Sequence, residues 1–125
     1  MKIRMRNKIQ FDDQLEVIDQ VYDVELREKG DFSYLLFYNE DQEKVVLKFN
    51  GEELIMSRFS NPKTIMRFLK DSDSLANIPT PIGMQEFIIQ TSHYEVGEEK
   101  IELAYQLQNK EGVSFANYCL EITWG

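Results

Sequence analysis

The sequence contains a single cysteine, Cys119, among its 125 residues. One cysteine cannot form a disulfide within the chain, and a lack of disulfides is typical of a reducing compartment. No stretch approaches the roughly 20 consecutive apolar residues of a transmembrane helix, so we expect no membrane association. The first residues, MKIRMRNKIQF, also lack the apolar core of a signal peptide. Together these absences predict a cytoplasmic protein.

Histidine is equally scarce, because His93 is the only one in the chain. Zinc sites combine several histidine and cysteine ligands at short spacing, so we expect no bound metal. Nucleophilic catalysis needs a base and an orienting group, and Cys119 has no such set of partners in the sequence. There is also no phosphate-binding glycine loop and no paired-carboxylate motif. We therefore expect no cofactor and a protein that is not an enzyme.

Basic residues are outnumbered, with 14 Lys and Arg against 22 Asp and Glu and a formal charge of −8. This charge repels phosphate backbones, so we do not expect nucleic-acid binding. The basic residues that are present gather on one face of the first predicted strand, at Lys2, Arg4, Arg6 and Lys8. We interpret this face as a solvated one that prevents wrong edge pairing, and the alternative is a docking patch for an acidic protein or an RNA.

Alternation of apolar and polar residues with period two, the mark of half-buried strands, dominates the chain. In the stretch 14–26 the apolar parity changes near Asp19 and Gln20, which predicts a β-bulge or a bend there. The final strand, VSFANYCLEITW, should place alternate residues inward and Cys119 outward. Its predicted inward residues are Ala116, Tyr118, Leu120, Ile122 and Trp124.

Asn50-Gly51 separates the strand-like stretches KVVLKF and ELIMSRF. Asn-Gly tolerates the positive φ angles of a type I′ turn, so we predict an antiparallel hairpin. The stretch 60–77 is open to two interpretations. Asn61-Pro62 could start a helix, or Thr64, Met66 and Phe68 could share one face of a strand. The residues after it, DSDSLANIPTPIG, are rich in proline and turn-forming residues and predict a loop.

The whole chain, residues 1–125, is of the size of one domain. A series of strands with short turns and no helical crossovers predicts an all-β protein built as an antiparallel meander. Closure removes exposed edges, so we expect a single up-and-down barrel of about eight to nine strands. A β-sandwich is the alternative.

The order of KVVLKF, Asn-Gly, ELIMSRF, TPIGMQEFIIQT and KIELAYQLQ resembles the YwiB-like family of bacterial proteins. Thr80-Pro81 with Gly83 is the most specific part of this resemblance, although the family often has an aromatic residue where this chain has Ile82. The resemblance covers essentially the whole chain and implies a lipocalin-like (calycin) barrel of unknown function. It favours a strand over Thr64 to Phe68, and it brings no assigned catalytic residues.

Arg58 shares parity with Leu54 and Met56, so we expect it to point into the barrel, where a buried charge needs a partner. The resemblance also implies an arginine at this place after the hairpin. Its guanidinium could bind a ligand carboxylate or phosphate. Alternatively, it is structural and packs on an aromatic ring such as Trp124 or pairs with an internal acid, and calycin barrels are known for an Arg–Trp contact.

Thr91 and His93 share parity with Phe87 and Ile89. Together with Tyr105 and Tyr118 on neighbouring strands, inward polar groups of this kind could line a cavity. His93 precedes the turn at Gly97 and is also interpretable as a half-exposed residue near a strand end. Pro81 and Gly83 restrict the backbone after Thr80, and we expect Thr80, Pro81 and Gly83 to shape one mouth of the barrel.

These features predict a non-enzymatic barrel that binds a small apolar or anionic molecule in its interior. The candidate ligand-binding residues are Arg58, Thr91, Tyr105 and Tyr118. The alternative is a barrel filled by its own large side chains, which acts through its surface and forms a homodimer through a paired edge strand.

Overall fold

The computed structural model describes residues 1–125 and contains eleven β-strands and no helix. The all-β prediction is confirmed, although there are more strands than expected. The strands are β1 (Lys2–Phe11), β2 (Gln14–Asp23), β3 (Glu25–Lys29), β4 (Phe32–Tyr38), β5 (Lys44–Phe49), β6 (Glu53–Phe59), β7 (Thr64–Leu69), β8 (Asp73–Thr80), β9 (Gly83–Gly97), β10 (Lys100–Gln108) and β11 (Ser114–Trp124).

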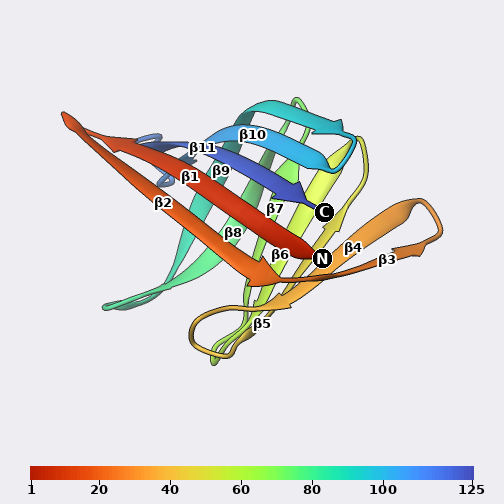
Figure 1. Ribbon diagram of the computed structural model, residues 1–125. Coiled ribbons are helices and arrows are strands. Elements are labelled where there is room, and N and C mark those ends of the chain that lie inside the picture. The colour runs from red at the N-terminus through yellow and green to blue at the C-terminus, as the bar shows by residue number, and fades with distance from the viewer.

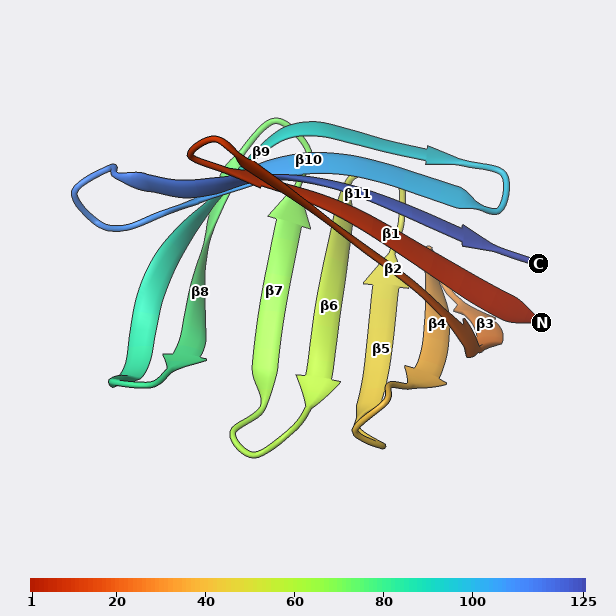
Figure 2. The same cartoon turned by 60° about the vertical axis from the view of Figure 1, so that its left-hand side comes forward.

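The strands form two antiparallel sheets, a six-stranded sheet in the order β2-β1-β11-β10-β9-β8 and a five-stranded sheet in the order β3-β4-β5-β6-β7. The two layers face each other, and their strands cross at a steep angle (Figures 1 and 2). Neither sheet closes on itself, so the expected single closed barrel is not confirmed. Between β7 and β8 the pairing is reduced to one bridge, Leu69 with Ser72. Two facing sheets correspond to the sandwich alternative.

Strand β9 forms the corner that joins the layers, and Figure 2 shows it curving from beside β8 over to β10. A β-bulge marks the bend, since His93 lies opposite Ala104 while Thr91 lies opposite Tyr105, leaving Ser92 as the additional residue. A bulge bends a strand and changes the faces on which later side chains lie. As a result Thr91 is buried, whereas Ser92 and His93 are exposed.

The core lies between the two sheets and contains a cluster of 16 buried residues. Leu35, Leu47 and Leu54 come from the five-stranded sheet, and each is fully buried. They meet side chains of the facing sheet, including Ile101 and Ile122. Burial of one such side chain is worth about 1.5 to 3 kcal/mol. The inward parity predicted for β11 is confirmed, since its buried and half-buried cluster members are Leu120, Ile122, Tyr118 and Trp124, and Ala116 is buried as well.

The predicted hairpin of β5 and β6 is confirmed, with Phe49 opposite Leu54. The type I′ turn is wrong, because neither Asn50 nor Gly51 has a positive φ. Instead, the Asn50 side-chain oxygen accepts hydrogen bonds from the amides of Glu52 and Glu53, at 2.9 and 3.0 Å. Asparagine thus stabilises this turn through its side chain and not through an unusual backbone angle.

The β4–β5 and β10–β11 loops have the same construction. Asn39 and Asn109 each begin a loop, and each side-chain oxygen accepts two backbone amide hydrogen bonds from later loop residues. The fourth position has a positive φ in both loops, 61° at Gln42 and 80° at Gly112. A glycine is expected at such a position, and only the second loop has one.

The parity change in residues 14–26 does not reflect a bulge at Asp19 and Gln20, so that prediction is wrong. β2 pairs with β1 without a register shift, from Asp23 opposite Lys2 to Gln14 opposite Phe11. The strand is interrupted only at Val24, after which β3 pairs with β4 in the other sheet. The apolar residues that precede the parity change in this stretch face solvent and do not belong to the core.

The stretch that was open to a helix or a strand interpretation is a strand, because Thr64–Leu69 forms β7 and pairs with β6. The loop predicted after it is wrong, since Asp73–Thr80 forms β8 and pairs with β9. Pro79 lies within β8, which is the edge strand of its sheet. A proline is tolerated at an edge because no further strand needs its missing N–H group.

A side-chain hydrogen bond also connects the two sheets. Tyr94 on β9 is only 5% exposed, and its hydroxyl lies 2.7 Å from the Asn50 carbonyl oxygen and 2.9 Å from that of Glu53. Both carbonyls belong to the β5–β6 hairpin of the opposite sheet. Burial, followed by the charges of Glu53 and Glu52, raises the pKa of Tyr94, so its hydroxyl stays protonated and remains a donor.

Candidate functional site

A cleft of about 580 Å³ lies beside the bend of β9. We call it the corner cleft. It brings together three of the four residues that the sequence suggested for ligand binding, from three adjacent strands. Its lining residues are Asp71, Ser72, Asp73, Gln90, Thr91, Ser92, Ala104, Tyr105, Gln106, Asn117, Tyr118 and Cys119.

Two stacked tyrosines and one threonine occupy a single cross-strand row of the cleft. Thr91 lies opposite Tyr105, which lies opposite Tyr118. The two ring centroids are 4.7 Å apart and the rings are nearly parallel, and Phe68 also packs on Tyr105, tilted, at 4.7 Å. Burial raises the pKa of Tyr105, and to a lesser extent the neighbouring Tyr118 does so too. Burial also raises the pKa of Tyr118, so both phenols remain neutral.

Thr91 is 7% exposed, and its hydroxyl oxygen is buried without a hydrogen-bond partner. Buried hydroxyl groups are usually paired, because an unpaired one costs roughly 1 to 3 kcal/mol. Thr91 also stands at the bend of β9, one residue before the bulge. The corner cleft therefore contains an unsatisfied polar group next to the bulge of β9.

A row of four amide side chains borders the cleft, and three of them, Gln90, Gln106 and Asn117, line it. Gln106 lies opposite both Gln90 and Asn117, and its side-chain nitrogen donates to Asn117 at 2.5 Å. Gln108 donates to Gln90 at 2.9 Å and to Gln106 at 3.2 Å. Sequence reasoning missed this row, although these residues have outward parity on β9, β10 and β11. The outward parity of these residues is visible in the sequence, but only the register between the strands shows that the amides lie side by side.

The charged groups that line the corner cleft are acidic. Asp71 and Asp73 come from the β7–β8 turn and the start of β8, and no lysine or arginine lines the cleft. The electrostatic potential of such a cleft disfavours an anion. Three amide and five hydroxyl side chains also line the cleft, and they offer both hydrogen-bond donors and acceptors to a neutral molecule.

Arg58 does not join the other three candidate residues. It lies on the inner face of β6, directly opposite the buried residues Val45 and Thr64, as parity predicted. Its side chain is nevertheless half exposed, so it does not enter the core, and its nearest acidic partner is Glu43 at 3.9 Å. Thr64, which lies opposite Arg58, and Phe68, on which Tyr105 packs, are roughly 13 Å apart along the extended strand β7.

The alternative of an Arg58–Trp124 contact is also not observed. Trp124 packs on Phe49 with ring centroids 5.4 Å apart. Phe49 pairs with Leu54, which lies near the start of β6, whereas Arg58 lies near the other end of that strand. The guanidinium therefore has an acidic partner near the β4–β5 loop and no aromatic one.

Thr80, Pro81 and Gly83 form the β8–β9 hairpin turn, at the edge of the six-stranded sheet (Figure 1). The Thr80 hydroxyl donates to the Gly83 carbonyl at 2.7 Å, and Gly83 has a φ of 110° that only glycine adopts readily. Ile82, between them, is 83% exposed. None of these residues lines the corner cleft.

His93 and Cys119 lie on the outer face of the six-stranded sheet. Outward exposure of Cys119 is confirmed, whereas the inward parity of His93 is wrong because the bulge turns its side chain outward. The half-exposed side chain predicted for His93 is confirmed. Both residues line a second, smaller cleft of about 230 Å³, which adjoins the corner cleft through Ala104 and Cys119.

Two of the four residues in the basic face of β1 pair with acidic residues of β2. Lys2 forms an ion pair with Asp23, and Arg4 donates to both oxygens of Asp19 at 2.9 and 2.6 Å. These hydrogen bonds hold the pKa of Asp19 below its ordinary value. Half of this basic face is therefore neutralised by β2, which weakens its attraction for an acidic partner.

Comparisons with known proteins agree with the fold. The chain matches the family described as "Domain of unknown function (DUF1934)" over residues 3–122. The crystal structure of the ywiB protein from Bacillus subtilis is similar, with a TM-score of 0.78 and 22% sequence identity, covering 99% of this chain and 90% of that chain. No curated protein matches.

The structure contains no helix of the length and apolar character needed to cross a bilayer. The resemblance to the YwiB-like family is confirmed, because the family match extends over nearly the entire chain and the solved YwiB fold superimposes on it. The chain belongs to the DUF1934 family of unknown function, whose YwiB-like fold it shares.

Proposed function

We propose that the protein is a non-enzymatic binding protein and that its ligand occupies the corner cleft. The observation that carries this proposal is the convergence of Thr91, Tyr105 and Tyr118 with the amide row in a cleft of about 580 Å³. Small-molecule sites typically have volumes of about 300 to 1,000 Å³ and combine aromatic walls with a few polar groups.

The composition of the cleft favours a small molecule with hydroxyl or amide groups over an anionic or an apolar one. The sequence suggested an apolar or anionic ligand, but an anion would need Arg58, which lies away from the cleft. Asp71 and Asp73 would repel an anion, and the amides of Gln106 and Asn117 would lose hydrogen bonds to an apolar ligand.

A substitution that fills the cleft tests this proposal. Ala104 lines the cleft from the outer face of β10, so Ala104→Phe should occupy the site without entering the core. Ser57→Phe places the same side chain on the outer face of β6 in the other sheet and serves as the control. Ligand-observed NMR with a library of neutral and anionic fragments of matched size is the assay.

We expect neutral amide and hydroxyl fragments to bind the wild-type protein and Ser57→Phe but not Ala104→Phe. Native mass spectrometry of protein from its own host should also retain a neutral molecule that Ala104→Phe loses. Binding only by anionic fragments, or equal binding by Ala104→Phe, would contradict the proposal.

A second candidate function is self-association through an edge strand, as the homodimer hypothesis stated, and β2 is the edge that favours it. β2 is a ten-residue edge strand, and its outer face carries three exposed apolar residues, Leu15 at 61%, Val17 at 45% and Val21 at 57%. An antiparallel pair of β2 strands centred on Ile18 would place Leu15 opposite Val21 of the second copy. Long apolar edge strands of this kind favour pairing with another strand.

Analytical ultracentrifugation tests this second candidate. Wild type should form a dimer, and Val17→Lys should shift it to monomer, because a charge on an edge strand opposes pairing. Ile65→Lys is the matched control, since Ile65 is an exposed apolar residue on β7. A wild-type monomer at high concentration would eliminate this candidate.

The spatial order of the strands supports a further proposal, that the two sheets are a lipocalin-like barrel opened along two seams. From β3 to β11 each strand follows its chain neighbour, and β1 and β2 complete the circuit next to β11. One seam lies between β7 and β8, and the other lies at Val24, where the chain passes between the sheets. A crystal structure with β7 and β8 paired along their length would support this relation, and a solvent-filled seam would oppose it.

A further inference from the structure

One imidazole and two carboxylates converge on the outer face of the six-stranded sheet, next to the corner cleft. His93 Nε2 lies 3.7 Å from Glu95 Oε2 and 3.8 Å from Glu102 Oε2. All three potential ligand atoms lie within 4.8 Å of one another. Glu95 and Glu102 face each other across β9 and β10.

The bulge in β9 creates this convergence. In a regular strand His93 would share the inward parity of Thr91, as the alternation in the sequence predicts. The additional residue, Ser92, moves His93 to the outer face, where it lies two positions from Glu95 and on the same side. Bulges frequently re-aim a side chain in this way beside a functional site.

The charges around the cluster leave one carboxylate without a cationic side chain. Glu95 and Glu102 are directly opposed, and like charges in such a pair are destabilising. Lys100 lies 2.7 Å from Glu102 and 3.6 Å from Glu121, and it forms no ion pair with Glu95. Glu95 contacts His93 instead. A cation bound beside the two glutamates would therefore relieve their mutual repulsion.

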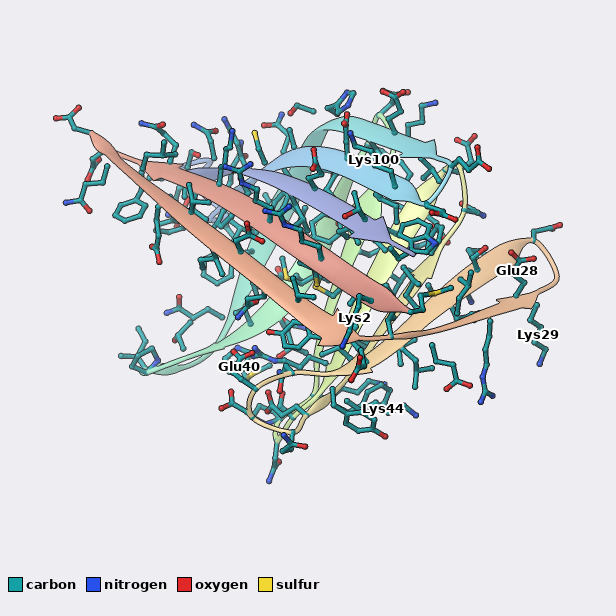
Figure 3. All side chains as sticks on the ribbon, in the orientation of Figure 1. Lys2, Glu28, Lys29, Glu40, Lys44 and Lys100 are labelled. Atoms are coloured by element: carbon teal, nitrogen blue, oxygen red, sulfur yellow. The ribbon has the colours of Figure 1, made fainter.

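Lys100 also orients Glu102 for this role. Its ammonium group contacts Oε1 of Glu102, while Oε2 is the oxygen that faces His93. Figure 3 labels Lys100, which lies at the start of β10 beside the β9–β10 turn. Neighbouring groups that fix a ligand in one orientation are a regular feature of metal sites.

We propose that His93, Glu95 and Glu102 form a binding site for a divalent transition-metal ion, with Zn²⁺ as the ion of best fit. Two ligands at about 2.1 Å from a tetrahedral zinc ion are about 3.4 Å apart. His93 Nε2 lies 3.7 and 3.8 Å from the two carboxylates, and no two of the three ligand atoms are more than 4.8 Å apart, so side-chain rotation would draw them together around the ion. Three protein ligands leave the fourth position to water.

This inference departs from the expectation of no metal, which rested on the lack of a second histidine or cysteine. Carboxylates also serve as zinc ligands, but their great number in an acidic chain hides them in the sequence. The proposal is independent of the corner cleft, because none of the three ligands lines that cleft.

Isothermal titration calorimetry with Zn²⁺ on the tag-free, full-length chain tests the site. We expect saturable binding of one zinc ion per chain, and at least tenfold weaker binding by both His93→Ala and Glu95→Gln. The matched control is Glu28→Gln on β3, an exposed glutamate labelled in Figure 3, whose affinity should equal that of wild type. All these residues are at the surface, so circular dichroism should show an unchanged fold.

Because His93 is the only histidine, its ring nitrogens give a single set of signals in an ¹⁵N NMR spectrum. Zinc should shift these signals in wild type and in Glu28→Gln. The proposal is overturned if zinc does not bind saturably, if the imidazole signals do not move, or if His93→Ala and Glu95→Gln bind zinc as tightly as wild type.

Discussion

The hydrogen bond between Tyr94 and the β5–β6 hairpin predicts a measurable loss of stability in Tyr94→Phe. The substitution keeps the buried ring and removes only the hydroxyl, which lies 2.7 Å from Asn50 O and 2.9 Å from Glu53 O. The Glu53 carbonyl keeps its bond from the Asn50 amide at 3.0 Å. The Asn50 carbonyl would lose its donor in a partly buried position.

The expected cost follows from these contacts. A hydrogen bond contributes a net 0.5 to 1.5 kcal/mol or so, and a buried acceptor left unpaired adds to that loss, so we expect about 1.5 kcal/mol for Tyr94→Phe. For a chain of this length that loss lowers the melting temperature by roughly 6 °C. Removal of the ring in Tyr94→Ala should cost about 3 to 5 kcal/mol, because a cavity is then added.

Urea denaturation measures the free energy of unfolding of each variant, and an unchanged m-value would show that the folded and unfolded states keep their exposed areas. Tyr38→Phe is the control, because Tyr38 is 57% exposed and should change stability by less than about 0.5 kcal/mol. If Tyr94→Phe is no less stable than Tyr38→Phe, the hydroxyl does not hold the two sheets together and the reasoning fails.

Three further predictions concern stability. Gly112→Ala should lower the free energy of unfolding, measured by urea denaturation, by about 1 kcal/mol. Gln42→Ala should leave it unchanged, because Gln42 already has a side chain at positive φ. Equal effects of the two substitutions would refute this explanation. Thr64→Val should raise the free energy of unfolding by about 1 kcal/mol, because the Thr64 hydroxyl is buried without a partner, and a loss would show that a partner exists. Burial raises the pKa of Tyr94 and Tyr105, so the unfolded chain loses these protons first. The stability of wild type should therefore fall as pH rises above about 10, and fall less steeply in Tyr94→Phe.

Much of the strand arrangement was predictable because period-two alternation is a local property of the chain. The inward residues of β11 and the β5–β6 hairpin follow from residues close together in sequence. The same reasoning failed for Leu15 and Val17, whose apolar side chains are exposed on an edge strand. Alternation identifies the two faces of a strand, but it does not say which of them meets another layer.

The candidate site was predictable only in part. Thr91, Tyr105 and Tyr118 meet because the register of three strands aligns them, and parity was sufficient to select them. Arg58 was selected by the same rule, but it lies near the end of β6 and its side chain is half exposed. Parity gives the direction in which a side chain leaves the strand, whereas its burial depends on the distance to the facing sheet.

The sequence by itself determined an all-β chain, the faces of most of its strands and its family. Tertiary structure decided that the strands divide into two sheets, that β9 bends through a bulge at Ser92, and that His93 meets Glu95 and Glu102 on the outer face. The physical reason is that a bulge adds one residue where the curvature of the sheet requires it. That curvature depends on packing between strands distant in sequence, and one added residue reverses the face of every side chain that follows.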